Sequence, residues 1–219
     1  GYYARARNLY KCALYIAGEL GGEFPTDYDD LLKLPGVGVY TAAAISSIVY
    51  DFPATVVDGN VERVLSRLFN ITTPLPDSRP EIREYAELLT PDHRPGDYAQ
   101  GLMDLGATIC MPRVLKCESC PLHDDCKSSA LGTAAELPAR IRKKARQTRR
   151  GYAFWAEYDG KVWLRRRPEK GLLGGMMEVP SDEWVPSNSW DNFPTPRIPI
   201  IANWEILPGM VRHTFTHFH

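Results

Sequence analysis

Apolar residues recur at helical spacing through the first half of the chain. In residues 4–20 leucine, alanine and isoleucine return every three or four positions, and Gly21-Gly22 ends the run. The same spacing predicts helices over residues 40–50, 81–89 and 97–109. We therefore expect residues 1–129 to form an all-helical domain.

Two more helices are predicted from the residues at their starts. Thr26 begins a T-x-x-D pattern before YDDLLKL and is expected to cap a short helix. In DGNVERVLSRLF, Asp58 stands directly before a helix, and Asn60 is an equally suitable cap, which leaves one of the two for another role. One face of this helix is apolar and comprises Val61, Val64, Leu65 and Leu68.

The pattern changes after residue 130. Residues 140–150 contain seven lysines and arginines and no acid, which is typical of a linker. Farther on, YAFWAEY, a D-G turn and KVWLRRR predict a β-hairpin. We expect an α+β multidomain protein with a helical domain (1–129), a basic linker (130–150) and a sheet-containing domain (151–219). Both folded domains are expected to be incomplete, the first at its N-terminal side and the second at its C-terminal side.

The net charge of −1 conceals an uneven distribution. Residues 110–170 carry 15 lysines and arginines against 7 acids, whereas the regions on either side are acidic. A basic segment of this kind suits a polyanionic partner, and a solvated basic linker would have the same composition. No apolar stretch approaches the roughly 20 residues that span a bilayer, so we expect no membrane partner.

The stretch LPGVG, residues 34–38, predicts a hairpin between two helices. Gly36 and Gly38 permit a tight turn and leave backbone N–H groups accessible. The start of the following helix favours an anion, so the hairpin is suited to clamping one DNA phosphate without reading a base. An ordinary turn between helices is the alternative.

Four cysteines lie within 17 residues, in the order C-x6-C-x2-C-x5-C. Without a secretory signal, disulfides are the weaker interpretation. Four thiolates suit either a tetrahedral zinc ion or a [4Fe–4S] cluster, and spacing alone does not separate the two. Cys12 stands apart and is expected to be a small buried apolar residue. The candidate ligands are Cys110, Cys117, Cys120 and Cys126.

Together, the LPGVG hairpin, Asp58 in VDGNV and the cysteines after MDLGATI resemble the helix-hairpin-helix DNA glycosylase superfamily. The resemblance is closer to its MutY-type adenine glycosylase branch, and it runs from GYYARARNL through GLLGGMMEVP to HTFTHFH. It implies a [4Fe–4S] cluster rather than zinc, and a Nudix-like second domain that recognises 8-oxoguanine. The implied activity is monofunctional release of adenine opposite 8-oxoguanine or guanine in duplex DNA, a reaction that requires base flipping.

The resemblance also implies roles for individual residues. Asp58 would stabilise the cationic sugar, as carboxylates do in glycoside cleavage, with help from Asn60 and Tyr40. Tyr40 stands where endonuclease III-like lyases carry the lysine that forms a Schiff base. Gly36 and Gly38 would hold DNA, Tyr2 would wedge beside the lesion, and Gly175 would lie where the backbone nears DNA. The residues implied to contact 8-oxoguanine are Phe215, Thr216 and His217.

Two departures from the family pattern and two alternatives accompany this interpretation. The family's general acid is a glutamate in a segment that precedes GYYARARNL, so we expect residues 1–219 alone to lack robust glycosylase activity. The clustered glutamates of true Nudix hydrolases are absent after Gly174-Gly175, which disfavours a pyrophosphohydrolase. The alternatives are an endonuclease III-like glycosylase and lyase acting on oxidised pyrimidines, and a non-catalytic DNA-binding iron–sulfur module.

The remaining expectations concern assembly and location. We expect a monomer, located in the cytoplasm with the nucleoid if the source is bacterial. In a eukaryote we expect the nucleus or the mitochondrion.

Overall fold

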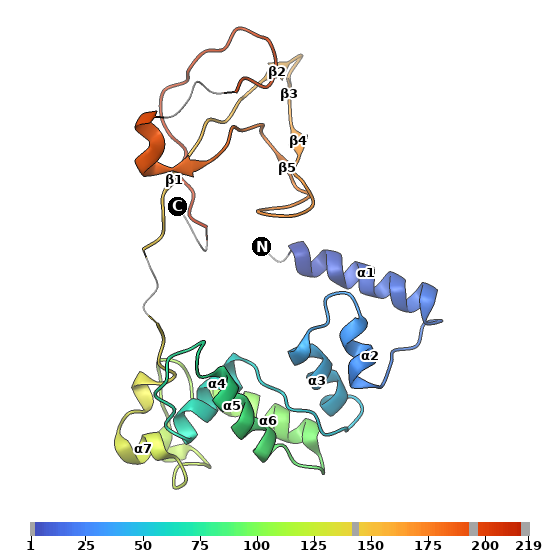
Figure 1. Ribbon diagram of the computed structural model, residues 1–219, viewed down its shortest axis with the longest axis vertical. Helices are drawn as coiled ribbons and strands as arrows, with labels where there is room; N and C mark the ends of the chain where they lie inside the picture. Colours follow the sequence, from blue (N-terminus) through green and yellow to red (C-terminus); the bar gives the residue numbers. More distant parts are fainter. Residues whose placement is uncertain (1–2, 142–144, 193–196, 216–219) are drawn as a thin grey trace. The chain divides into compact units, whose positions relative to one another are not determined.

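A computed structural model of the protein describes residues 3–141, 145–192 and 197–215 (Figure 1). The chain divides into two compact units. The first, Arg5–Arg142, is called the helical unit below. The second, Lys143–His219 together with Gly1–Ala4, is called the sheet unit.

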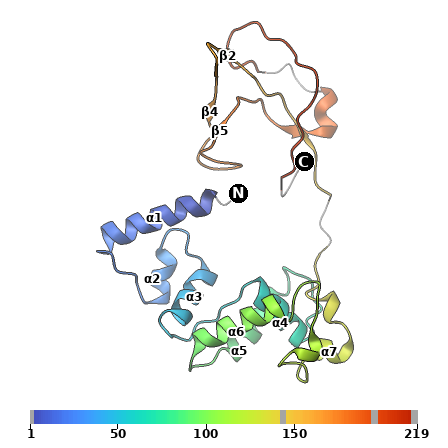
Figure 2. The same ribbon diagram turned by 180° about the vertical axis from the view of Figure 1, so that it is seen from behind.

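The helical unit contains seven α-helices among its described residues. They are α1 (Tyr3–Glu19), α2 (Tyr28–Lys33), α3 (Val39–Ile48), α4 (Gly59–Leu68), α5 (Arg79–Leu89), α6 (Pro95–Thr108) and α7 (Lys127–Leu131), with 3₁₀ turns at Cys117–Ser119 and Ala134–Glu136. Figures 1 and 2 show α1, α2 and α3 as one group and α4 to α7 as another. Helix α6 packs against both α3 and α4 and so joins the groups.

The apolar face predicted for α4 forms the main core. Val61, Val64 and Leu65 are buried against residues of α5 and α6, including Ile82 and Leu102. A second core joins α1, α2 and α3, and comprises Cys12, Ile16, Leu31, Leu34 and Ala42. Cys12 is 7% exposed, which confirms its predicted burial.

The caps of two helices test the predicted starts. Asp58 is the N-cap of α4 and accepts hydrogen bonds from the backbone N–H groups of Asn60 and Val61, both at 2.8 Å. The prediction for α2 is wrong by one residue, because Asp27 and not Thr26 is the cap. The Asp27 carboxylate accepts from the N–H groups of Asp29 at 2.9 Å and Asp30 at 3.3 Å. A carboxylate in this position also suits the positive end of the helix dipole.

The described strands of the sheet unit form antiparallel pairs. β1 (Arg149–Arg150) pairs with β6 (Val185–Pro186), β2 (Glu157–Tyr158) with β3 (Lys161–Val162), and β4 (Arg165–Arg166) with β5 (Met177–Glu178), and a 3₁₀ helix, η3, covers Ser187–Asn192. The predicted hairpin is confirmed at β2–β3. Asp159 and Gly160 both have positive φ, 50° and 66°, as the tight two-residue hairpin turn requires.

Phe154 provides part of the sheet unit's small core. It is 8% exposed and meets Trp204 edge-on, with ring centroids 5.4 Å apart. Across the described residues of both units, no helix is long and apolar enough to span a membrane.

Candidate active site and nucleic-acid interface

The hairpin of residues 34–38 links α2 to α3 and requires its first glycine. Gly36 has a φ of 82°, and a Cβ added there would lie 2.6 Å from Cβ of Asn8 on α1. Gly38 is the N-cap of α3 and provides no side-chain hydrogen bond. The first turn of α3 therefore presents backbone N–H groups that no side chain caps, at the end of the helix that attracts anions.

Asp58 and Asn60 act together and not as alternatives. The Oδ1 atom of Asp58 accepts the two capping N–H bonds, and its Oδ2 atom accepts a hydrogen bond from Nδ2 of Asn60 at 3.0 Å. Both side chains are partly buried. The carboxylate is therefore held in one orientation at the start of α4, where a carboxylate could stabilise a cationic sugar.

Arg63 connects this pair to the cysteine loop. Its Nη2 atom donates to Oδ1 of Asn60 at 2.8 Å and to the carbonyl of Gly106 at 2.6 Å, and its Nε donates to the carbonyl of Cys110 at 2.8 Å. Burial, and then the neighbouring charge of Arg67, lower the pKa of Arg63 below its ordinary value. A guanidinium only donates, so the Asn60 oxygen must face Arg63 and its NH₂ group must face Asp58.

Tyr40 lies on α3 and reaches α6. Its side chain is 44% exposed, and its hydroxyl is 3.7 Å from Sδ of Met103. Asn60 meets the same helix at Gly106. Helix α6 is thus the common support of α3, which carries Tyr40, and of the start of α4, which carries Asp58.

The four cysteines line one cavity of ≈30 Å³, together with Arg67, Lys116 and His123. All four are free thiols. Burial raises the pKa of Cys120, and the other three thiols raise it further, although the N–H of Leu122 opposes them. Within the described part of the chain, no three His, Cys, Asp or Glu side chains are arranged to hold a metal ion. The donor set is that of a thiolate site for zinc or iron–sulfur.

Arg67 supports this cavity from α4. It is 2% exposed, and its Nη1 atom donates to Sγ of Cys110 at 3.2 Å and to the carbonyl of Met111 at 2.9 Å. Its Nε donates to the carbonyl of Leu137 at 2.9 Å. A buried cation beside four thiols offsets the negative charge that deprotonated sulfurs would bring.

Sequence reasoning missed Arg63, Arg67 and Gly106. The two arginines are one helical turn apart beside an apolar face, where an arginine side chain is normally expected to be exposed to solvent. These arginines are buried because α4 is short and is packed by helices on more than one side, and only the tertiary structure shows this packing. No pattern in the stretch MDLGATIC, residues 103–110, distinguishes Gly106 from its neighbours.

In the sheet unit, Gly175 lies in the tight loop between β4 and β5. It has a φ of 76°, and a Cβ on the preceding Gly174 would lie 2.3 Å from the carbonyl oxygen of Glu169. Arg167 fastens the loop because its Nε donates to the carbonyl of Leu172 at 2.7 Å.

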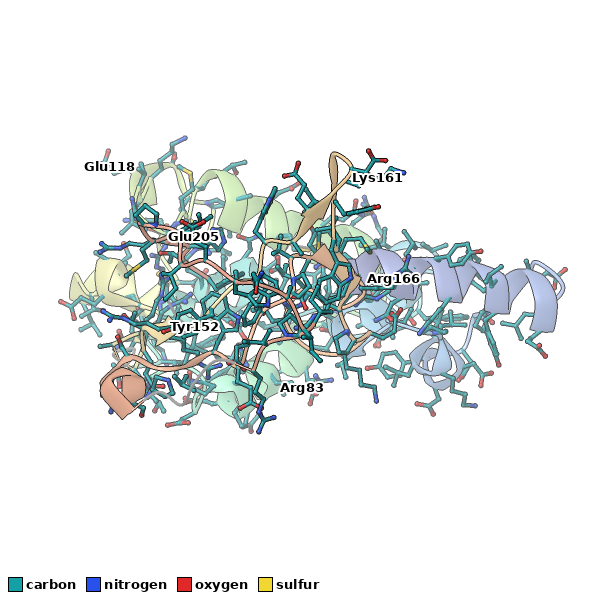
Figure 3. The ribbon with its side chains drawn as sticks, turned by 90° about the horizontal axis from the view of Figure 1, so that it is seen from above. Arg83, Glu118, Tyr152, Lys161, Arg166 and Glu205 are labelled. Atoms are coloured by element: carbon teal, nitrogen blue, oxygen red, sulfur yellow. The ribbon has the colours of Figure 1, made fainter. Side chains whose placement is uncertain are left out.

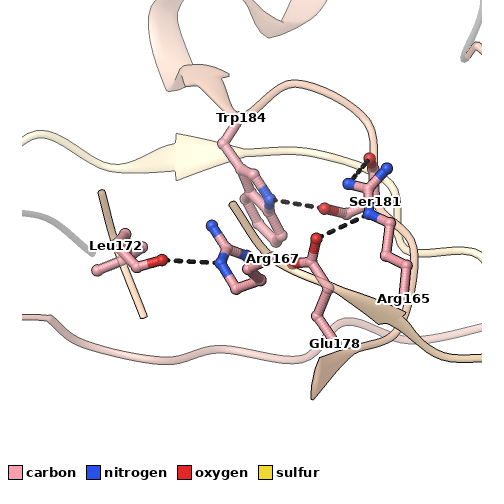
Figure 4. Close-up of polar contacts among 6 residues, drawn as sticks. All are labelled: Arg165, Arg167, Leu172, Glu178, Ser181 and Trp184. Atoms are coloured by element: carbon pink, nitrogen blue, oxygen red, sulfur yellow. Dashed lines mark hydrogen bonds and ion pairs between the residues drawn. The ribbon is translucent and has the colours of Figure 1, made fainter. Parts of the chain in front are cut away.

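Glu178 is the shared partner of the two arginines that hold this loop (Figure 4). It is ion-paired with Nη1 of Arg167 and accepts from Nε of Arg165 at 2.8 Å. Arg165 also donates to the carbonyl of Ser181, whose hydroxyl accepts from the Trp184 indole at 3.3 Å. The geometry of the Gly175 loop is thus tied to strands β4 and β5.

The other residues predicted for the sheet unit are partly described. Phe215 meets His213 edge-on, with ring centroids 4.5 Å apart. Lys161 and Arg166, which the sequence did not single out, are exposed on β3 and β4 (Figure 3). Tyr2, Thr216 and His217 lie outside the described residues.

Two family models match the chain. One, described as a helix-hairpin-helix motif, matches residues 19–48 and so includes the Gly36–Gly38 hairpin. The other, described as a NUDIX domain, matches residues 151–219.

Known proteins are similar over most of the chain. The adenine DNA glycosylase of Buchnera aphidicola subsp. Schizaphis graminum is 33% identical over 197 residues, which cover 86% of this chain and 57% of that protein. The adenine DNA glycosylase of Homo sapiens is 31% identical over 274 residues, covering 99% of this chain and 50% of that protein. The chain thus spans about half the length of the curated relatives it matches.

A solved structure supports the fold of the helical unit. The structure of a non-covalent endonuclease III–DNA complex matches with a TM-score of 0.51 and 32% identity, covering 60% of each chain. Together with the two family models, this similarity confirms the predicted fold class, a helix-hairpin-helix glycosylase fold with a Nudix-like region.

Proposed function

We propose that the chain, which belongs to the MutY-type helix-hairpin-helix DNA glycosylases, acts in the release of adenine opposite 8-oxoguanine or guanine in duplex DNA. One observation carries the proposal: Asp58 is fixed at the start of α4 by two backbone N–H groups and Asn60. Breaking an N-glycosidic bond builds positive charge on the sugar, and a preorganised carboxylate stabilises that charge.

The other groups bind and orient. The uncapped start of α3 at Gly38 is suited to one DNA phosphate, and Tyr40 lies on the same helix, supported by Met103. In the sheet unit, Gly175 and Phe215 are proposed to approach the strand that carries 8-oxoguanine. Tyr2, Thr216 and His217 keep the roles that the family resemblance implies.

The test uses binding, because the family's general acid is not assigned to any residue of this chain. Two duplexes carry, opposite 8-oxoguanine, either a neutral tetrahydrofuran or a cationic pyrrolidine in place of the target sugar. We expect the 219-residue chain to prefer the cationic duplex by about tenfold, because a charge-assisted contact with Asp58 is worth that much. Fluorescence anisotropy measures both dissociation constants.

Asp58→Asn is the matched control. Asparagine retains the oxygen that caps the helix, so this variant should fold and bind the neutral duplex, although its NH₂ group replaces the oxygen that accepts from Asn60. It should lose the preference for the cationic duplex. Equal binding of both duplexes by the parent chain would contradict the proposal, and robust adenine release by residues 1–219 would contradict the expectation about the general acid.

Tyr40 separates this proposal from an endonuclease III-like lyase. A tyrosine cannot form a Schiff base with the sugar, so borohydride should trap little or no covalent complex with DNA that contains an abasic site. Efficient trapping would favour the lyase.

We propose that Cys110, Cys117, Cys120 and Cys126 hold a [4Fe–4S] cluster, because the four thiols share one cavity beside buried Arg67. When bound, the cluster would tie the loop after α6 into the fold. Purified protein should contain iron and acid-labile sulfide in equal amounts. A colourless protein containing zinc alone would contradict the assignment.

Removing the metal gives a second readout of the same site. Hydrogen exchange should accelerate in residues 110–126 and not in residues 153–180, because only the first segment provides the thiol ligands. Equal acceleration in both segments would argue against a local structural role for the metal.

A further inference from the structure

Helix α6 carries three glycines whose surroundings differ. A Cβ added to Gly106 would lie 2.7 Å from Cβ of Asn60 and 3.2 Å from its Cα and its carbonyl oxygen. A Cβ on Gly96 would lie 2.4 Å from the carbonyl oxygen of Ser47 on α3. A Cβ added to Gly101 would meet no other heavy atom of the described residues within 4 Å, apart from its chain neighbours and the nearby backbone of its own helix. The helix therefore makes two close approaches, one to α3 and one to the start of α4.

The contact at Gly106 includes the groups that hold Asp58. The carbonyl of Gly106 accepts from Nη2 of Arg63, and the same Nη2 atom donates to Oδ1 of Asn60. The Nδ2 atom of Asn60 in turn donates to Oδ2 of Asp58. Gly106 is thus in van der Waals contact with Asn60 and hydrogen-bonded to the arginine that orients it.

We propose that Gly106 is a positioning residue for Asp58. Its missing side chain allows α6 to hold Asn60 in the position from which the amide reaches the carboxylate. This inference rests on the proposed function, since it gives Asp58 the sugar cation as its target.

The two atoms that would overlap are the added Cβ at position 106 and the Cβ of Asn60. An alanine Cβ is fixed by its backbone, and so is the Cβ of Asn60, so neither can turn away as the end of a long side chain would. At 2.7 Å the two carbons overlap, and only a shift of the α4 backbone at Asn60 away from α6 relieves the overlap. That displacement of Asn60 lengthens the 3.0 Å bond between Asn60 and Asp58.

The experiment compares three alanine variants in the full 219-residue chain. The readout is the ratio of the dissociation constants for the neutral and the cationic abasic-site duplexes described above. Loss of folded protein weakens binding to both duplexes alike, so the ratio reports the position of Asp58 and not stability. Gly106→Ala should lower a preference of about tenfold to about twofold or less, because the carboxylate no longer faces the cationic sugar.

Gly101→Ala and Gly96→Ala are the matched controls. Gly101→Ala makes the same change on an exposed face of the same helix and should leave both dissociation constants unchanged. Gly96→Ala makes an equally severe clash at the α3 end of the helix, away from Asn60, and should weaken both complexes without changing the ratio. A parent-like ratio in folded Gly106→Ala would overturn the inference.

A double-mutant cycle keeps the inference testable if Gly106→Ala folds poorly. Asn60→Gly removes the Cβ that meets the added methyl group. In that background Gly106→Ala should shift the urea midpoint much less than it does in the parent. Equal shifts in both backgrounds would overturn the inference. A parent chain with no preference for the cationic duplex would overturn the proposed function instead, and the cycle would still decide whether Gly106 and Asn60 are coupled.

Discussion

In the helical unit, the groups around Asp58 and the cysteines are held by buried hydrogen bonds to backbone atoms. Arg63 and Arg67, 9% and 2% exposed, donate to carbonyls at Gly106, Cys110 and Leu137. In the sheet unit, the loop of Gly175 is held by an ion-paired side chain, Glu178, between two strands that have exposed residues. The first arrangement fixes atoms through packed helices, and the second depends on a few side chains.

The difference predicts unequal tolerance to substitution. A buried donor that loses its charge leaves several carbonyls without a partner, each at a cost of about 1–3 kcal/mol. A partly exposed ion pair can be replaced by water at little cost. We therefore expect the helical unit to be rigid and sensitive to mutation around its site. The Gly175 loop of the sheet unit should adjust more easily, as would suit its proposed contact with the strand that carries the lesion.

Arg67→Met should produce the largest effect. It removes the donors to the carbonyls of Met111 and Leu137 and to Sγ of Cys110 while retaining an apolar stem. We expect the free energy of unfolding of the helical unit to fall by about 3 kcal/mol. Urea unfolding, followed by the far-UV circular dichroism of the helices, measures this change. Arg79→Met, which breaks an exposed pair with Glu62, is the control and should cost under about 1 kcal/mol.

These buried arginines also show why part of the site was beyond prediction. The α4 face, the Asp58 cap and the β2–β3 turn depend on spacing and on residues next to each other, so local pattern was sufficient. The carbonyls of Gly106, Cys110 and Leu137, which accept from Arg63 and Arg67, lie 43 to 70 positions along the chain from these arginines. Which carbonyls come near is decided by how α6 packs on α4, and no local pattern encodes it.

The two residues at the start of α4 show the same division. Asp58 and Asn60 are equally suitable caps by residue type, so the sequence alone does not decide which of them caps the helix. In the structure only Asp58 caps, and Asn60 donates to it because Arg63 occupies the other side of the amide. The sequence left the choice of cap open because Arg63, the third residue of the network, had no signal of its own.

Glu178→Gln should have an intermediate effect and tests the other side of the comparison. Glutamine retains one oxygen acceptor but cannot pair with both Arg165 and Arg167. Because the side chain of Arg165 is 48% exposed, we expect a cost of about 1.5 kcal/mol, confined to the sheet unit. Hydrogen exchange in residues 168–176 measures it. Glu157→Gln, the same change at an exposed residue of β2, should leave exchange unchanged, and a loss as large as that of Arg67→Met would refute the comparison.

Asp27→Ala should have the smallest effect, and it tests the corrected start of α2. The carboxylate caps a six-residue helix whose Leu31 is fully buried in the second core of the helical unit. Loss of the cap should cost about 1 kcal/mol in urea unfolding, whereas Asp27→Asn should cost only a few tenths, since asparagine also accepts from the first turn. Thr26→Ala should be neutral, because the structure gives the cap to the next residue. If Thr26→Ala were the costlier change, the T-x-x-D pattern would have located the cap correctly. Helix α2 packs against α3, so the same measurement shows how firmly the hairpin between them is anchored at its entry.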